Sequence, residues 1–419
     1  MIVPPDSHAY RRYALGLLLA VNLLNYIDRQ VLYAVFPLVK ADLGLSDTAL
    51  GLLGSAFMLT YMLSAPLFGW IGDRASRIRL AAGGLVVWSL ATGLAGLAPG
   101  YRTLLAARTT VGIGEASFGT VSPGLVADFF PRERRGQVLS WFYLAIPVGS
   151  ALGYILGGVL GQKFGWHAAF LMVGIPGLLL GLPVWFIREP NLGGVRKMPE
   201  AANNNSGAGY LALFRNRSYI LNTLAMAAMT FALGGLAQWL PSFLHRIHGL
   251  DIARGNTLFG AITVLAGISG TLAGGWLGDR LQRKNARGYL LVSGWGFVIG
   301  APIAAGAIVA QTLPVCLTAI FLAEFFLFLN TGPLNTVIVN VTAKAIRAMA
   351  FAVNIFFIHA LGDAVSPTLI GRCSDLWGIR NALLITPAAM VLAAVFCFIC
   401  GRFIAGDTAT SETPPYTPT

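Results

Sequence analysis

Residues 69–74 read GWIGDR and residues 275–280 read GWLGDR, so one hexapeptide occurs twice at an offset of 206 residues. Each copy ends an apolar stretch of about 20 residues or more, the length that crosses the hydrocarbon core of a bilayer. Each copy also opens a loop that is rich in arginine. Because both copies occupy the same place in their half of the chain, the halves are predicted to be parallel repeats.

Working outward from the hexapeptides, we find six apolar segments before the polar stretch around residue 200 and six after it. The sequence therefore predicts an all-α membrane protein with 12 transmembrane helices in two pseudo-symmetric six-helix bundles. The expected bundles are residues 1–190 and 217–405. Residues 191–216 are predicted to be a cytoplasmic linker, and residues 406–419 a disordered tail.

The composition agrees with a lipid-embedded chain. Hydrophobic residues make up 56% of the sequence, charged residues make up 11%, and the mean hydropathy is +0.70. A soluble domain is typically about 25% charged. With the N-terminus placed inside, 20 of the 29 Lys and Arg residues fall on the inner side and 7 on the outer side. This bias predicts cytoplasmic termini, and it explains the net charge of +12 without a nucleic-acid partner.

Ionisable side chains within the predicted spans are the strongest functional signal of the first half. Asn25, Asp28 and Arg29 lie on the first span, and Arg108 and Glu115 share one face of the fourth. A charge at the centre of a membrane helix costs about 2.5–3.5 kcal/mol on insertion scales. We therefore expect these residues to form a binding and coupling cluster. A static ion-pair network that ties the half together is the alternative.

The second half carries fewer charges inside its spans. Glu324 and Asn335 lie on the tenth span, and His359 and Asp363 lie one helical turn apart on the eleventh. The spacing of the last two predicts a hydrogen bond between them. Whether His359 contacts a ligand or is a packing residue stays open at this level.

The repeated hexapeptide resembles the signature loop of the major facilitator superfamily, a large group of transporters. The resemblance implies a cytoplasmic latch that is closed in the outward-facing state. In that latch Asp128 would face an arginine of the loop, and Asp73 would lie near the start of the eleventh span. Ordinary positive-inside charge is the alternative interpretation of the loop. The implied gate residues are Gly69, Asp73, Arg74, Arg77, Asp128, Asp279 and Arg280.

Longer stretches resemble the spinster branch of that superfamily. They include NYIDRQVL (25–32), RTTVGIGEASF (108–118) and IHALGDAVSPTLIG (358–371). Spinster relatives move lysophospholipids or sphingosine phosphate in animals. The resemblance implies that Asp28 and Arg29 of the first span take part in substrate binding and proton coupling. It implies the same for Arg108 and Glu115 of the fourth span. The long tails of the animal proteins are missing, which favours a bacterial inner-membrane protein.

The leading hypothesis is a monomeric secondary transporter that moves an amphiphilic anion or lysolipid by alternating access. Protons are the expected coupling ion, because Asp28 and Glu115 can gain protons when they are desolvated. A broad organic-anion or drug exporter or facilitator is the alternative, and a lipid receptor without flux is a third hypothesis. No enzyme, cofactor or metal motif is present in the sequence, so we expect neither catalysis nor a cofactor.

Overall fold

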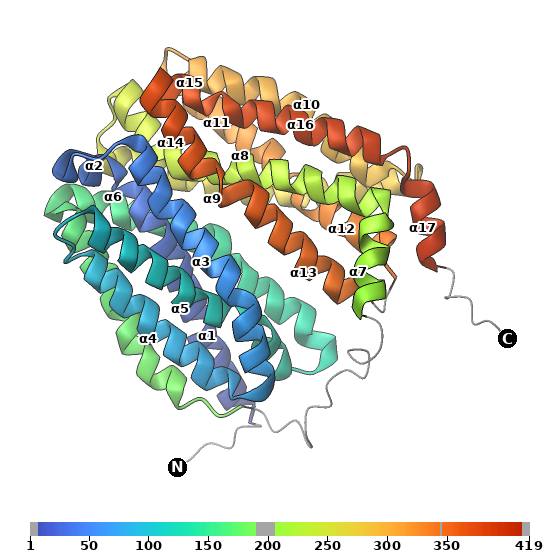
Figure 1. Cartoon of the computed structure of the whole chain (residues 1–419), viewed down its shortest axis with the longest axis horizontal. Coiled ribbons are helices and arrows are strands. Elements are labelled where there is room, and N and C mark those ends of the chain that lie inside the picture. The colour runs from blue at the N-terminus through green and yellow to red at the C-terminus, as the bar shows by residue number, and fades with distance from the viewer. Residues whose placement is uncertain (1–6, 190–205, 344–345, 413–419) are drawn as a thin grey trace. The chain divides into compact units, whose positions relative to one another are not determined.

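The computed structural model describes residues 7–189, 206–343 and 346–412 (Figure 1), and every regular element in these ranges is a helix. The elements are α1 (His8–Ala34), α2 (Phe36–Leu43), α3 (Asp47–Arg74), α4 (Arg77–Ala95), α5 (Tyr101–Asp128), α6 (Arg132–Trp185), α7 (Ser206–Arg215), α8 (Arg217–His248), α9 (Ile252–Gln282), α10 (Gly288–Val309), α11 (Leu313–Phe328), α12 (Thr331–Val341), α13 (Arg347–Ile358), η3 (His359–Asp363), α14 (Ser366–Trp377), α15 (Ile379–Leu383), α16 (Ile385–Cys400) and α17 (Ile404–Glu412).

Nine stretches of the described residues are long and apolar enough to cross a membrane. Helices α1 and α5 are not among them, and both carry charged residues in their interior. Helix α6 holds two predicted spans that meet at Gly165, where a φ of 83° breaks the helix. The predicted count of 12 spans therefore stays a prediction, whereas the all-helical membrane class agrees with the structure.

The chain divides into two compact units. Unit 1 comprises residues 1–194, 237–264 and 367–379, and unit 2 comprises residues 195–236, 265–366 and 380–419. This division differs from the predicted one, because the end of α8, the start of α9 and helix α14 pack with the first six helices. For example, the side chain of Asn256 donates a hydrogen bond of 3.1 Å to the carbonyl oxygen of Ala34.

In unit 1, α6 lies along α1, and small residues make this contact possible. A Cβ atom at Gly153 would lie 2.6 Å from the carbonyl oxygen of Ile27, and one at Gly157 would lie 2.8 Å from Cβ of Ala34. Helices α3 and α4 both pack on α5 (Figure 1). This packing brings the charged residues of α1 and α5 to the interior of the unit.

In unit 2, α10 packs against α11, α12 and α16. Residues 206–215, within the predicted linker, form α7, and residues 404–412, which reach into the predicted tail, form α17. Helix α7 buries Leu213, and in α17 the carboxylate of Asp407 accepts a hydrogen bond of 2.9 Å from the backbone N–H of Ser218. These contacts give helical order to parts of the predicted linker and of the predicted disordered tail. The other residues of those segments lie outside the described ranges.

Candidate functional site

The four charged residues of α1 and α5 meet inside unit 1. The Nε atom of Arg29 lies 2.7 Å from Oε2 of Glu115, and Nη1 of Arg108 lies 3.6 Å from Oδ1 of Asp28. Each helix thus supplies one acid and one base, and each acid faces the base of the other helix. Arg108 and Glu115 are fully buried, and Asp28 is 3% exposed. The predicted cluster is therefore present as two crossed ion pairs.

Neighbouring helices complete the cluster with residues that the sequence analysis missed. The hydroxyl of Thr92 on α4 donates a hydrogen bond to Oδ2 of Asp28. On α3, the centre of the Phe57 ring lies 5.1 Å from the guanidinium carbon of Arg29 and 5.1 Å from that of Arg108. Cation–π attraction stabilises both positive charges in this buried place. No motif distinguishes Phe57 from the many lipid-facing or packing aromatics, so its role became visible only in the fold.

Several polar atoms of this cluster lack hydrogen-bond partners within the described part of the chain. They include all three nitrogen atoms of the Arg108 guanidinium and Nδ2 of Asn25. A buried donor that makes no hydrogen bond costs about 1–3 kcal/mol, and more when the group is charged. By contrast, Asn22 of the same helix donates to the carbonyl oxygen of Phe142 at 2.7 Å. The cluster therefore offers uncommitted donors at Arg108 and Asn25.

The site residues predicted in the second half lie in unit 2. Nδ1 of His359 lies 2.9 Å from Oδ1 of Asp363, as the one-turn spacing predicted. Both residues belong to η3, a π-helical turn, and such turns are frequent at functional sites. Asn335 donates within its own helix to the carbonyl oxygen of Thr331 at 2.7 Å, and Glu324 on α11 is 4% exposed. The structure thus confirms the contact of His359 with Asp363, while Asn335 donates its hydrogen bond within its own helix.

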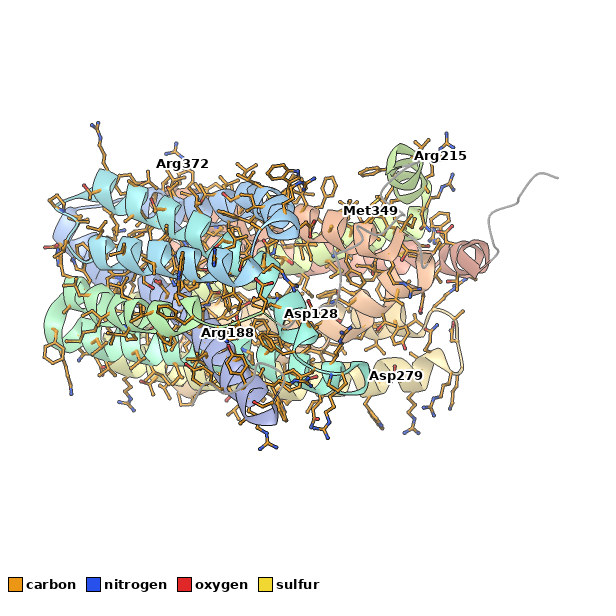
Figure 2. The ribbon with its side chains drawn as sticks, turned by 90° about the horizontal axis from the view of Figure 1, so that it is seen from below. Asp128, Arg188, Arg215, Asp279, Met349 and Arg372 are labelled. Atoms are coloured by element: carbon orange, nitrogen blue, oxygen red, sulfur yellow. The ribbon has the colours of Figure 1, made fainter. Side chains whose placement is uncertain are left out.

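The predicted latch contact between Asp128 and an arginine of the loop is present in unit 1. Nη2 of Arg77 lies 2.5 Å from Oδ2 of Asp128 (labelled in Figure 2). Glu189, which the sequence analysis missed, contributes a second carboxylate at 3.7 Å from Nε of Arg77. Asp73 is exposed and makes no hydrogen bond or ion pair within the described ranges. Its expected position near the start of the eleventh predicted span, the span that holds His359, stays a prediction.

The two copies of the hexapeptide have matching local structures. Arg74 stacks on Trp70 with 4.3 Å from the guanidinium carbon to the ring centre, and Arg280 stacks on Trp276 with 5.4 Å. Asp279 of the second copy (Figure 2) accepts a hydrogen bond of 2.8 Å from the hydroxyl of Tyr289.

The second glycine of each hexapeptide, rather than the first, permits a close approach of side chains. A Cβ atom at Gly72 would lie 2.7 Å from Val121, and one at Gly278 would lie 2.7 Å from Tyr289. A Cβ atom at Gly69 would make an ordinary contact of 3.5 Å. Gly69, which was predicted to belong to the gate, therefore has no close-packing role in unit 1.

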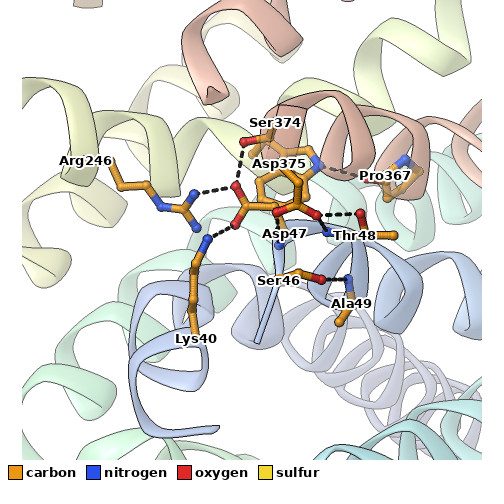
Figure 3. Close-up of polar contacts among 10 residues, drawn as sticks. Lys40, Ser46, Asp47, Thr48, Ala49, Arg246, Pro367, Ser374 and Asp375 are labelled. Atoms are coloured by element: carbon orange, nitrogen blue, oxygen red, sulfur yellow. Dashed lines mark hydrogen bonds and ion pairs between the residues drawn. The ribbon is translucent and has the colours of Figure 1, made fainter. Parts of the chain in front are cut away.

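A further ionic cluster in unit 1 was not predicted (Figure 3). Asp47, at the start of α3, accepts hydrogen bonds from Lys40, from Arg246 near the end of α8, and from Ser374 on α14. Asp375 accepts from the backbone N–H groups of Asp47 and Thr48 at 2.8 and 2.9 Å. Segments from both halves of the sequence thus meet at the N-terminus of one helix, where backbone N–H groups attract a carboxylate.

Comparison with known proteins identifies the family. A sequence model of the Major Facilitator Superfamily matches residues 18–367. Human protein spinster homolog 1 is 37% identical over 383 residues, which cover 85% of this chain and 71% of the human protein. The chain belongs to the spinster family of the major facilitator superfamily. A mouse spinster protein, a sphingosine-1-phosphate transporter, is 33% identical over 93% of this chain and 77% of its own length.

Solved structures show the same fold. A crystal structure of a bacterial homologue of the human lysosomal transporter spinster, in an inward-facing and unoccupied conformation, matches with a TM-score of 0.88. The alignment has 23% identity and covers 98% of this chain and 100% of the other. An inward-facing and occupied structure matches with a TM-score of 0.85. The predicted major facilitator fold is confirmed, and this spinster-family chain is a multi-pass membrane transporter and not an enzyme.

Proposed function

We propose that the protein moves an amphiphilic anion of the lysolipid or sphingolipid class by alternating access linked to proton movement. The observation that carries the proposal is the buried guanidinium of Arg108, whose three nitrogen atoms have no hydrogen-bond partner among the described residues. A phosphate or carboxylate headgroup would satisfy these donors, since arginine matches both groups in a bidentate geometry. The sphingosine-1-phosphate transporter among the relatives supports this substrate class.

The crossed ion pairs support proton linkage. An anion that engages Arg108 competes with Asp28 for the same guanidinium, which lies 3.6 Å from that carboxylate. A buried carboxylate that loses its positive partner favours the protonated form, because burial disfavours a charge. Anion binding and proton uptake would then be coupled, and this coupling is reciprocal in binding free energy. Glu115 is in the same position relative to Arg29, at 2.7 Å.

An organic-anion facilitator without proton linkage is the second candidate function. The short contact of Arg29 with Glu115 and the aromatic rings around Arg29 favour it, because a well-satisfied buried pair can be purely structural. This candidate predicts transport that does not respond to a pH gradient, whereas the first predicts transport that does.

The cellular setting proposed here is a bacterial inner membrane with both termini in the cytoplasm and the protein acting as a monomer. The threefold excess of Lys and Arg on one side supports the orientation. Cysteine labelling of residues 190–209 in intact cells tests it. Labelling by an impermeant reagent added outside would contradict the proposed topology.

The substrate class is tested by a stabilisation screen in detergent followed by flux measurements in proteoliposomes. The screen compares lysophosphatidic acid and sphingosine phosphate with hydrophilic acids such as citrate. A ligand at about 100 times its Kd stabilises the native state by about 2.7 kcal/mol, which raises the melting temperature. Stabilisation by citrate but not by the amphiphiles would contradict the substrate class. Flux that is unchanged by an imposed pH gradient would favour the facilitator.

A further inference from the structure

A hollow of about 510 Å³ lies at one end of unit 1, where the start of α4 meets the residues that follow α6. Its lining consists of Ser76 and Arg79 from α4 and its cap, and of residues 185–189 from the end of α6. These two segments lie far apart in the sequence, and no motif of the sequence analysis pointed to their contact. The hollow is separate from the crossed ion pairs between α1 and α5.

Two exposed arginines line this hollow. The backbone N–H of Arg79 donates to the hydroxyl of Ser76, and the backbone N–H of Arg188 (labelled in Figure 2) donates to the hydroxyl of Tyr10. Neither guanidinium forms a hydrogen bond or an ion pair with any residue that the structure describes. Arg79 and Arg188 thus bring two positive charges to one hollow. Arginine donates paired hydrogen bonds to phosphate, so a phosphate suits this lining.

The negative charge of Glu189, the acidic residue of the lining, already has partners within unit 1. Its Oε1 atom accepts hydrogen bonds of 2.6 Å from the hydroxyl of Ser76 and of 3.0 Å from the backbone N–H of Ile78. Its Oε2 atom lies 3.7 Å from Nε of Arg77. The start of a helix and a neighbouring arginine therefore balance this carboxylate. The positive charges of Arg79 and Arg188 remain available to an anion.

Two aromatic side chains also line the hollow. Trp185 is 47% exposed and Phe186 is 71% exposed, and both lie at the end of an apolar stretch that is long enough to span a membrane. Tryptophan is enriched at this level of membrane proteins, where apolar rings border the lipid headgroups. The hollow thus has both apolar rings and two arginines in its lining. This combination suits a lipid at the boundary between the hydrocarbon core and the headgroups.

We propose that this hollow binds the phosphate headgroup of an anionic phospholipid of the surrounding membrane. Arg79 and Arg188 hold the phosphate, and the first part of an acyl chain packs against Trp185 and Phe186. The bound lipid sits beside Arg77, the residue that pairs with both Asp128 and Glu189. The hollow shares no lining residue with the crossed ion pairs, so the proposed lipid site is distinct from the proposed substrate site.

Binding of phosphatidylglycerol with a fluorescent acyl chain, followed by anisotropy in detergent micelles, tests the proposal. The test variant is Arg79→Gln/Arg188→Gln. The matched control is Arg283→Gln/Arg287→Gln, which removes the same charge from two exposed arginines at the start of α10 and in the loop before it. One arginine near a headgroup contributes about five-fold to binding, so the test variant should bind about 25-fold more weakly than wild type. The control should bind like wild type.

Two further binding measurements distinguish an anionic phospholipid from a zwitterionic phospholipid and from free phosphate. Phosphatidylcholine with the same label carries a phosphate but no net charge, and it should bind more weakly than phosphatidylglycerol. Sodium phosphate as a competitor should displace the lipid poorly, because it lacks the acyl chain. Equal loss of binding in the test and control variants would overturn the site. Equal binding of phosphatidylcholine would overturn the anionic requirement, and displacement by an equal concentration of sodium phosphate would overturn the lipid assignment.

Discussion

The Nε atom of Arg29 lies 2.7 Å from Oε2 of Glu115, whereas Arg108 and Asp28 are separated by 3.6 Å. The Arg29–Glu115 pair is therefore the shorter of the two ion pairs. Asp28 also accepts a hydrogen bond from Thr92, so its charge does not depend on Arg108 alone. Arg108 has no such second partner among the described residues. An incoming anion can thus engage Arg108 without breaking a short hydrogen bond.

Substitution of the two acids should separate binding from its pH dependence. Glu115→Gln mimics the protonated acid, so it should keep substrate affinity while losing the weakening that proton linkage predicts for wild type as pH rises. Asp28→Asn should behave likewise, or should uncouple flux from a proton gradient. Affinity measured from pH 5 to 9 and flux with and without a gradient provide the test. Wild-type pH dependence in both carboxamide variants would show that the four charges are a structural network.

Removal of the bases should weaken anion binding at every pH. Arg29→Ala removes a positive charge from the anion site, so affinity should fall across the whole pH range. Arg108→Gln should in addition destabilise the protein, because breaking a buried ion pair costs about 3–5 kcal/mol. The double variant Asp28→Asn/Arg108→Gln should recover most of that stability but not the binding. Melting temperatures and titrations measure both effects, and normal affinity in Arg108→Gln would contradict its role.

The cluster at Asp47 should hold α14 against the start of α3. Arg246→Gln removes a charge-assisted hydrogen bond of 2.7 Å, and such bonds contribute about 1.5–3 kcal/mol. Cys373 of α14, which is buried, should then react with a thiol reagent about ten-fold faster. Arg254→Gln removes an exposed arginine whose side chain has no such partner among the residues that the structure describes, and it serves as the control. Peptide mapping of the alkylated cysteine gives the rate, and equal rates in both variants would disprove the contribution of Arg246.

The two glycines of the first hexapeptide should differ in their tolerance of a methyl group. Gly72→Ala places a Cβ atom 2.7 Å from the stiff side chain of Val121, and such overpacking costs about 1–3 kcal/mol. Gly69→Ala meets Thr120 at 3.5 Å, an ordinary contact, so it should be neutral or slightly stabilising. Melting temperatures in detergent compare the variants. A lower melting temperature for Gly69→Ala than for Gly72→Ala would contradict the packing seen in unit 1.

The sequence by itself determined which charged residues belong together. A charge within a membrane helix is costly, so the presence of Asp28, Arg29, Arg108 and Glu115 in two spans already indicated a common cluster. Spacing of one turn was sufficient to predict the contact of His359 with Asp363. The repeated hexapeptide indicated the membrane fold and the parallel halves, because both depend on patterns that recur along the chain.

Only the tertiary structure decided which acid faces which base, and which neutral residues support them. The rotation of α1 against α5 pairs Arg29 with Glu115, and the approach of α3 and α4 brings Phe57 and Thr92 to the charges. The cluster around Asp47 likewise depends on segments more than 190 residues apart in the chain. A membrane helix must be apolar on nearly every face, so its sequence does not distinguish a side that packs on a neighbour from one that faces lipid. Those contacts arise only when the helices are packed together.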